Sequence, residues 1–252
     1  LSDSDTTHLR ALRRVVVATP AKQRTPLVPA PRWHRTAPRY GTSMLSTVIV
    51  TGGSGVLGSA IARALYPSAA AVCLVSRRQQ PLQAAAEAIG PNAVALPCEI
   101  TDEKSVERMF ADAAARTGRP VGLLVNCAGT MAGGPTTEMS AQTFRDVLDV
   151  NVVGSFICAR EAFKVMAASG GGRVINVGSV AARTPRPNSA AYTTSKFALD
   201  GLTRSLALDG RPLNIACTAS DRTAWPRPHA SCRTLHLLTV PLLDAPFARP
   251  LA

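Results

Sequence analysis

Short apolar segments alternate with amphipathic segments through the middle of the chain. The apolar segments are four or five residues long, rich in Val, Ile, Leu and Ala, and such runs are typical of buried strands. We predict strands at residues 47–51, 71–75, 93–96, 121–125, 173–177 and 213–217. The segments between them repeat apolar residues at helical steps, which predicts helices at residues 57–66, 80–89, 103–116, 141–168 and 190–208.

Strands that are apolar on both faces and alternate with helices are typical of a parallel sheet covered on each side. Because crossovers between parallel strands are right-handed, we predict an α/β fold with a Rossmann-type, doubly wound parallel sheet over residues 44–217. The alternation stops after residue 217, so we expect this sheet to be incomplete at its C-terminal edge.

Both ends of the chain differ from this middle region. Residues 1–43 hold five prolines among scattered arginines and predict a disordered basic leader. The leader is either a transit peptide, which would place the protein in a mitochondrion or plastid, or sequence upstream of a natural start at Met44. We favour the second interpretation and a cytoplasmic location. Residues 218–252 also hold five prolines and predict an atypical Pro-rich tail.

Composition narrows the class of protein. Apolar residues make up 46% of the chain and aromatic residues 4%, which allows a sizeable aliphatic core. No apolar run reaches the roughly 18 residues of a membrane-spanning helix, so we expect no membrane partner. The six cysteines are widely spaced without a C-x-x-C pair. This spacing argues against a metal site and favours buried thiols in a reducing compartment.

The net charge of +12 is unevenly distributed. Residues 1–43 carry +6 of it, whereas the much longer segment 44–217 carries +4. The charge therefore says little about the predicted domain, and the few aromatic residues offer little surface for base stacking. We expect no nucleic-acid partner.

A glycine-rich turn follows the first predicted strand and has the spacing G-x-G-x-x-G. Glycines there let the backbone approach a pyrophosphate, and the next helix offers free N–H groups at its N-terminus. Its position between a strand and a helix favours a dinucleotide site over a plain turn. The residues expected to bind the cofactor are Gly52, Gly53, Ser54, Gly55, Leu57 and Gly58.

The second strand is followed by Arg77 and Arg78 instead of the carboxylate that binds the ribose hydroxyls of NAD. Guanidinium groups pair with a 2′-phosphate, so we predict NADP(H), although a solvated Arg pair is the alternative. After the third strand, Glu99 or Asp102 can accept from the adenine amine, and Asp102 can equally cap the next helix.

Small residues after the fourth strand complete the expected cofactor site. They let the backbone lie against the cofactor, although a plain strand-to-loop turn has the same composition. From these two strand ends, the residues predicted to bind the cofactor are Glu99, Ile100, Asn126, Ala128 and Gly129.

Four residues further along carry candidate chemistry. Tyr192 and Lys196 are four apart on a predicted helix and share one face. An ammonium beside a phenol lowers the phenol's pKa, so that it can exchange a proton with a carbonyl oxygen. Ser179 follows the fifth strand and could hold that oxygen, and Asn151 could bind a water that feeds protons to Lys196. Each residue alone also has a purely structural interpretation, which their joint occurrence disfavours.

Five features of the sequence occur together: the loop at residues 51–58, the N-x-A-G segment at residues 126–129, Asn151, Ser179 and the Tyr192-x-x-x-Lys196 pair. With these features the chain resembles the short-chain dehydrogenase/reductase family. The resemblance covers residues 44–217 and is greatest to 3-oxoacyl-[acyl-carrier-protein] reductases and carbonyl reductases, enzymes of fatty acid biosynthesis and related reactions. It implies hydride transfer between a nicotinamide and a carbonyl or alcohol substrate, free or bound to acyl-carrier protein. It also implies a Ser–Tyr–Lys–Asn tetrad, with Tyr192 and Lys196 touching the cofactor.

The resemblance further implies a homo-oligomer, either a dimer or a tetramer. In the family, the helices that carry Asn151 and Tyr192 pack against their copies in a partner subunit. The apolar residues that could serve both the core and this interface are Phe144, Val147, Phe156 and Phe163.

Departures from the family pattern define a second hypothesis. Val56 replaces the middle glycine, and Glu99 stands where Asp is usual. After Cys217 the chain lacks the family's Pro-Gly loop, covering helices and seventh strand. An exposed edge strand and an open active site are then expected. The alternative is a catalytically compromised homologue that only binds dinucleotide or partner subunits.

Overall fold

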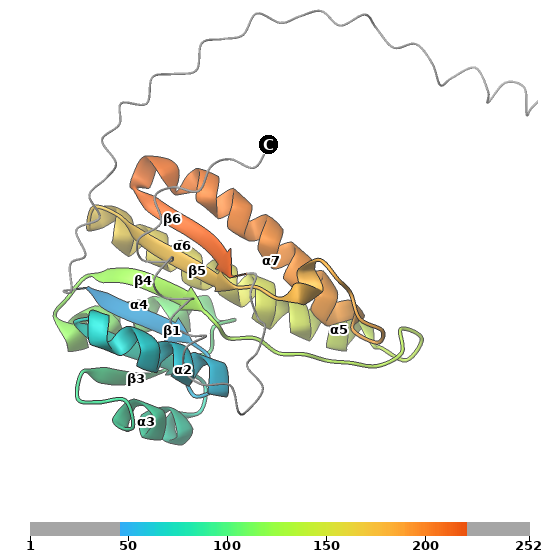
Figure 1. The fold of residues 1–252 in the computed structure, drawn as a ribbon, viewed down its shortest axis with the longest axis horizontal. Helices are drawn as coiled ribbons and strands as arrows, with labels where there is room; N and C mark the ends of the chain where they lie inside the picture. Colours follow the sequence, from blue (N-terminus) through green and yellow to red (C-terminus); the bar gives the residue numbers. More distant parts are fainter. Residues whose placement is uncertain (1–45, 221–252) are drawn as a thin grey trace, which may run out of the picture. The chain divides into compact units, whose positions relative to one another are not determined.

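The computed structural model describes residues 46–220, so the leader predicted at residues 1–43 and most of the predicted tail lie outside the described residues. Six parallel strands form one sheet in the order β3-β2-β1-β4-β5-β6 (Figure 1). The predicted α/β, doubly wound sheet is confirmed. The strands are β1 (Thr47–Thr51), β2 (Ala71–Ser76), β3 (Ala93–Pro97), β4 (Val121–Asn126), β5 (Gly172–Val177) and β6 (Ile215–Ser220).

Alternating side chains of the strands feed two hydrophobic cores, one on each face. Val48 and Val50 of β1 pack with the residues of α2 and α3, while Ile49 between them packs with those of α4 and α6. Both faces of the strand are therefore apolar, as expected for a covered parallel sheet. The helices are α2 (Val56–Leu65), α3 (Gln79–Glu87), α4 (Glu103–Thr117), α5 (Ala141–Leu148), α6 (Ser155–Ala168) and α7 (Ala190–Asp209).

The single long helix predicted at residues 141–168 is wrong in one respect. A π-helical turn at Asp149–Gly154 separates α5 from α6. Asn151 lies in this turn, with its side chain buried and hydrogen-bonded outside the helix. Apolar periodicity continues through such a turn, so the sequence pattern alone does not reveal it, and π-turns are frequent at functional sites.

The predicted bounds of the last strand are also wrong. Asn214 has a left-handed backbone, with φ of 56°, so β6 begins at Ile215 instead of at residue 213. It then continues through Ser220, pairing Thr218 with Ile175 and Ser220 with Val177. The sheet therefore includes Thr218, Ala219 and Ser220, which the sequence predicts as part of the tail.

Asp102 is the N-cap of α4. Its carboxylate accepts hydrogen bonds from the backbone N–H groups of Lys104 and Ser105, each at 3.2 Å. Of the two roles considered for this residue, the structure displays the capping role.

Packing at two helical glycines leads to opposite expectations for their replacement by Ala. A Cβ on Gly58 in α2 would lie 2.2 Å from Gly52 O, whereas a Cβ on Gly201 in α7 meets no atom within 4 Å. We expect Gly58→Ala to destabilise the fold by about 1–3 kcal/mol through overpacking. Gly201→Ala should stabilise it by about 0.5–1 kcal/mol, because Ala is the better helix former. Thermal unfolding of both variants checks this, and equal shifts in Tm would contradict it.

The part of the chain between residues 46 and 220 contains no helix that is both long and apolar enough to cross a bilayer. Its five cysteines are unpaired thiols, four of them buried. Burial raises the pKa of the Cys73 thiol to about 12 and that of Cys127 to about 11. These thiols are therefore protonated and unreactive at neutral pH.

Candidate active site

The strand order reverses between β1 and β4, which are neighbours at the middle of the sheet (Figure 1). From β1 the chain proceeds outward through β2 and β3, and from β4 it proceeds to β5 and β6 on the other side. In open α/β sheets, ligands bind at the carboxyl ends of the strands at such a reversal. The glycine-rich turn after β1 and the segment after β4 meet here.

Thr51, the last residue of β1, joins these two segments. Its Oγ1 accepts hydrogen bonds from the backbone N–H groups of Cys127 and Ala128, at 3.0 and 3.1 Å. The role of this hydroxyl is not predicted from the sequence. The available signal was a Thr at the carboxyl end of an otherwise apolar strand.

Glycines bring the turn close to its neighbours. Gly52 has φ of +71°, and a Cβ on it would lie 3.0 Å from the backbone of Ala128; a Cβ on Gly53 would lie 2.7 Å from Leu74 Cβ. A Cβ on Gly55 would lie 3.2 Å from Gly52 O, and Gly55 itself is exposed. The turn thus packs tightly on the sheet and leaves the N-terminus of α2 accessible for a phosphate.

Val56 is the first residue of α2 and is 74% exposed. The close approaches of the turn to Ala128 and Leu74 occur at Gly52 and Gly53. The departure from the family's glycine at this position is therefore compatible with the observed shape of the turn.

Arg77 and Arg78 are exposed after β2. Arg77 Nη1 lies 3.8 Å from Glu99 Oε2, and these side chains are 75% and 41% exposed, so the ion pair is long and solvated. Glu99 Oε1 accepts hydrogen bonds from the backbone N and the Oγ1 of Thr101. Glu99 therefore orders its own turn and also faces the arginine.

Two predicted cofactor residues have their side chains directed into the protein. The amide nitrogen of Asn126 donates to Ser155 O at 3.0 Å and to Asn176 Oδ1 at 2.9 Å. The Ile100 side chain is 6% exposed and belongs to the core that contains Val106. Both residues are buried.

Lys196 is one of the two buried residues among the four candidate catalytic residues. Its side chain is buried, and Nζ donates to Val177 O at 2.8 Å. The same Nζ lies 5.7 Å from the centroid of the Tyr192 ring, so the two side chains are neighbours as their spacing predicted. Burial lowers the pKa of Lys196 below its ordinary value.

Asn151 is 1% exposed and hydrogen-bonded on both ends of its amide. Oδ1 accepts from Thr130 N at 2.7 Å, and Nδ2 donates to Thr130 O and to Ser195 Oγ, each at 2.9 Å. Both amide hydrogens are used within the protein. Only the second lone pair of Oδ1 remains for the water that the sequence analysis expected here.

Ser179 follows β5 and begins a short 3₁₀ turn at Val180–Ala182. Its Oγ accepts a hydrogen bond from Ala181 N at 3.1 Å. The hydroxyl hydrogen is not used in that bond, so it can be donated to a substrate oxygen. Ser179 comes two residues after Val177, whose carbonyl binds Lys196, and this bond links the end of β5 to α7.

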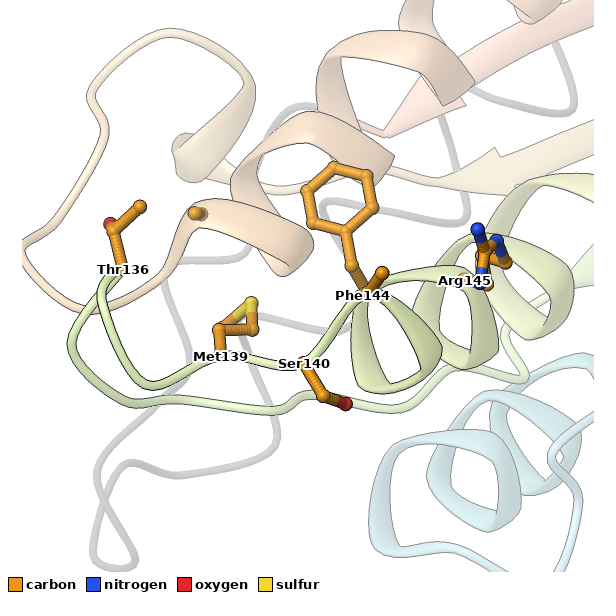
Figure 2. Close-up of a pocket in the computed structure, with 7 residues that line it drawn as sticks. Thr136, Met139, Ser140, Phe144 and Arg145 are labelled. Carbon is orange, nitrogen blue, oxygen red and sulfur yellow. The ribbon is translucent and has the colours of Figure 1, made fainter.

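A largely apolar hollow of about 360 Å³ lies between the segment after β4, the start of α5 and the start of α7. Figure 2 shows the Phe144 ring and Met139 pointing from the α5 side toward α7, while Ser140 points away. Ser140 Oγ instead accepts from Thr143 N and caps α5. Ala190, which completes the wall, is two residues before Tyr192.

Several observations fit a dinucleotide cofactor. The glycine turn exposes a helix N-terminus, and Arg78 has no ion-pair partner within residues 46–220. Ser76 Oγ, buried at the end of β2, has no hydrogen-bond partner in the described part of the chain. No cluster of three or more potential metal ligands occurs there either. The polar groups at this edge therefore suit phosphate and ribose oxygens.

Comparisons with known proteins identify the family of this chain. The short chain dehydrogenase family matches residues 46–221. A solved structure described as a putative short-chain alcohol dehydrogenase from Sinorhizobium meliloti 1021 superposes with a TM-score of 0.67 and 28% identity, covering 77% of this chain and 79% of that one.

Curated relatives include a 3beta-hydroxysteroid dehydrogenase from Mediterraneibacter gnavus, which is 32% identical over 68% of this chain and 63% of its own length. A 3-dehydrosphinganine reductase from Danio rerio is 35% identical over 69% of this chain and 54% of its own length. Carbonyl reductase family member 4 from Danio rerio is 30% identical over 77% and 84%. The chain thus spans between about half and two thirds of the first two relatives. The family match over residues 46–221 and these identities show that this chain belongs to the short-chain dehydrogenase family, whose members are oxidoreductases that use a nicotinamide dinucleotide.

Proposed function

We propose that this protein is an NADP(H)-dependent reductase that converts a carbonyl, either a 3-oxoacyl thioester or a related ketone, into an alcohol. The observation that supports this most strongly is the placement of Lys196. Its buried ammonium lies beside the Tyr192 ring and is bonded to the end of the strand that leads into Ser179. In this proposal Tyr192 would be the proton donor, Lys196 its cationic neighbour and Ser179 the hydroxyl for the substrate oxygen, at the sheet edge where ligands bind in such folds.

The chain's own residues would hold the cofactor along this edge. The glycine turn at residues 52–58 would receive the pyrophosphate, and Arg77 and Arg78 the 2′-phosphate. Glu99, Ala128 and Gly129 would border the adenosine and the nicotinamide ribose. When bound, the nicotinamide supplies the hydride that reaches the carbonyl carbon.

The protein supplies the proton and the orientation. Ser179 Oγ would donate a hydrogen bond to the carbonyl oxygen, and the Tyr192 hydroxyl would transfer its proton to that oxygen as charge develops on it. Lys196 would hold the nicotinamide ribose and favour the phenolate left on Tyr192. Asn151 would keep the neighbouring backbone in place and offer Oδ1 to a water that returns the proton.

An absorbance assay of NADPH oxidation tests this function directly. The full chain is mixed with NADPH and acetoacetyl-coenzyme A, a 3-oxoacyl thioester, or with small ketones. We expect NADPH consumption that depends on both the protein and the carbonyl. NADPH binding without any consumption would instead favour the catalytically compromised homologue.

Replacement of Lys196 by Ala should damage catalysis and cofactor affinity together, because the same ammonium is expected to serve both. We expect kcat to fall by about 10²-fold or more, by the usual size of a lost acid–base contribution, and the Kd for NADPH to rise. Steady-state kinetics and nicotinamide fluorescence measure the two effects. Lys164→Ala, at an exposed position on α6, is the control. If only kcat or only the Kd for NADPH changed in Lys196→Ala, the assignment would be wrong.

Self-association is expected through α6, the π-turn before it and α7. Phe156, Val153 and Phe197 are large apolar side chains that remain 42%, 43% and 48% exposed, and the π-turn packs against α7. Val147, by contrast, is buried in the fold itself. We expect a dimer at least, which Phe156→Arg converts to monomer, because burying an unpaired charge in an apolar contact is costly. Light scattering at micromolar concentration measures the oligomeric state. Ala111→Arg, at an exposed position on α4, is the control and should remain a dimer.

A further inference from the structure

Ser195 is a buried hydroxyl with no role in the proposed chemistry so far. It lies one residue before Lys196 on α7 and is 0% exposed. Its Oγ donates to the backbone carbonyl of Tyr192 at 2.7 Å and accepts from Asn151 Nδ2 at 2.9 Å. It therefore connects the backbone of the candidate proton donor to a residue outside its own helix.

Asn151 is itself held firmly on the other side. Its amide forms two hydrogen bonds with the backbone N and O of Thr130, at 2.7 and 2.9 Å. Thr130 directly follows Gly129, and a Cβ on Gly129 would lie 3.2 Å from Asn151 Oδ1. The segment after β4, the π-turn and the start of α7 are thus joined through one amide and one hydroxyl.

We propose that Ser195 is a positioning residue that sets the place of Tyr192 relative to the segment after β4, where the nicotinamide is expected to lie. This inference rests on the proposed function and adds to it a residue that acts only through Tyr192. Tyr192 is the third residue of α7, so its carbonyl belongs to the first turn of the helix, where a helix frays most readily. The hydroxyl of Ser195 ties this turn to Asn151 and thereby to the wall at residues 128–130.

A second hydroxyl on the same helix offers a matched control. Thr203 Oγ1 donates to Leu199 O at 2.7 Å and accepts from Asn176 Nδ2 at 2.8 Å, and Thr203 is 3% exposed. Like Ser195, it joins a helical carbonyl to a buried asparagine amide. It has no bond to Tyr192, Lys196 or Asn151. Ser195→Ala and Thr203→Val therefore remove the same kind of bond at two distances from the proposed chemistry.

The experiment measures both variants in the full chain. With NADPH and acetoacetyl-coenzyme A, we expect Ser195→Ala to lower kcat at least tenfold while the Kd for NADPH stays within twofold. Thr203→Val should leave both quantities within twofold. Thermal unfolding should show a loss of stability of similar size in the two variants, because each leaves one buried amide hydrogen without its acceptor.

A second measurement is independent of turnover. The chain contains three tyrosines, so labelling with 3-fluorotyrosine gives few fluorine NMR signals, and Tyr192→Phe identifies that of Tyr192. We expect Ser195→Ala to shift or broaden this signal and leave that of Tyr66 unchanged, whereas Thr203→Val alters neither.

Two results would overturn the inference. One is a Tyr192 signal that is identical in Ser195→Ala and the unmodified chain. The other is a loss of kcat no larger in Ser195→Ala than in Thr203→Val. If the unmodified chain consumes no NADPH with any carbonyl, the proposed function fails, and the fluorine signal still decides the positioning role.

Discussion

Tyr192→Phe is expected to remove carbonyl reduction while the protein still binds NADPH. Only the phenolic proton is lost, and the ring that lies beside Lys196 is retained. General acid catalysis contributes about 10²–10⁴-fold to a rate, so we expect kcat to fall by at least about 10²-fold. The Kd for NADPH should change by no more than about twofold, because the phenol is expected to act on the substrate oxygen in the transition state.

Tyr66→Phe is the matched control for this experiment. The Tyr66 hydroxyl accepts a hydrogen bond from Asn92 N at 3.3 Å, far along the chain from the candidate catalytic residues. Its loss should reduce stability slightly and leave kcat unchanged. If Tyr192→Phe retained a large part of the turnover, Tyr192 would not be the proton donor.

Arg77→Asp is expected to shift the preference from NADPH toward NADH. The guanidinium makes one long, solvated ion pair with Glu99, so it is available to a 2′-phosphate at little electrostatic cost. A hydrogen bond between charged groups contributes about 1.5–3 kcal/mol. The ratio of the two dissociation constants should therefore change by about ten- to a hundredfold, and further through repulsion by the new carboxylate.

Nicotinamide fluorescence measures both dissociation constants. Arg119→Asp makes the same change in net charge at the opposite end of the sheet, two residues before β4, and separates local from general electrostatics. We expect that variant to keep the original preference. Equal affinity for NADPH and NADH in the unmodified chain, or a preference that survives Arg77→Asp, would contradict the assignment.

The fold was predictable because its signals are local. Each strand is an apolar run, and each crossover helix has its own apolar periodicity and polar cap, as at Asp102 before α4. The two errors occur where tertiary contacts override such signals. The π-turn exists around an asparagine bonded to Thr130. β6 begins late because Asn214 has a left-handed backbone and its Nδ2 donates to Gly170 O at 2.8 Å.

The candidate site was predictable to a lesser extent. Tyr192 and Lys196 are neighbours because helical spacing makes them so, and Lys196 is buried as a proposed catalytic lysine should be. Thr51 and Ser195 were missed because small hydroxyl residues gain their roles from partners more than 40 residues away, namely Ala128 and Asn151. The inward direction of Asn126 likewise depends on Asn176 in the neighbouring strand.

The central claim is that this chain transfers a hydride from NADPH to a carbonyl. Mass spectrometry of the product tests it most directly: the full chain is incubated with acetoacetyl-coenzyme A and NADPH that carries two deuterium atoms at C4 of the nicotinamide. We predict a hydroxyacyl product that contains one deuterium, absent when Tyr192→Phe replaces the unmodified protein. Recovery of unchanged thioester, with bound NADPH that still carries both deuterium atoms at C4, would contradict the account.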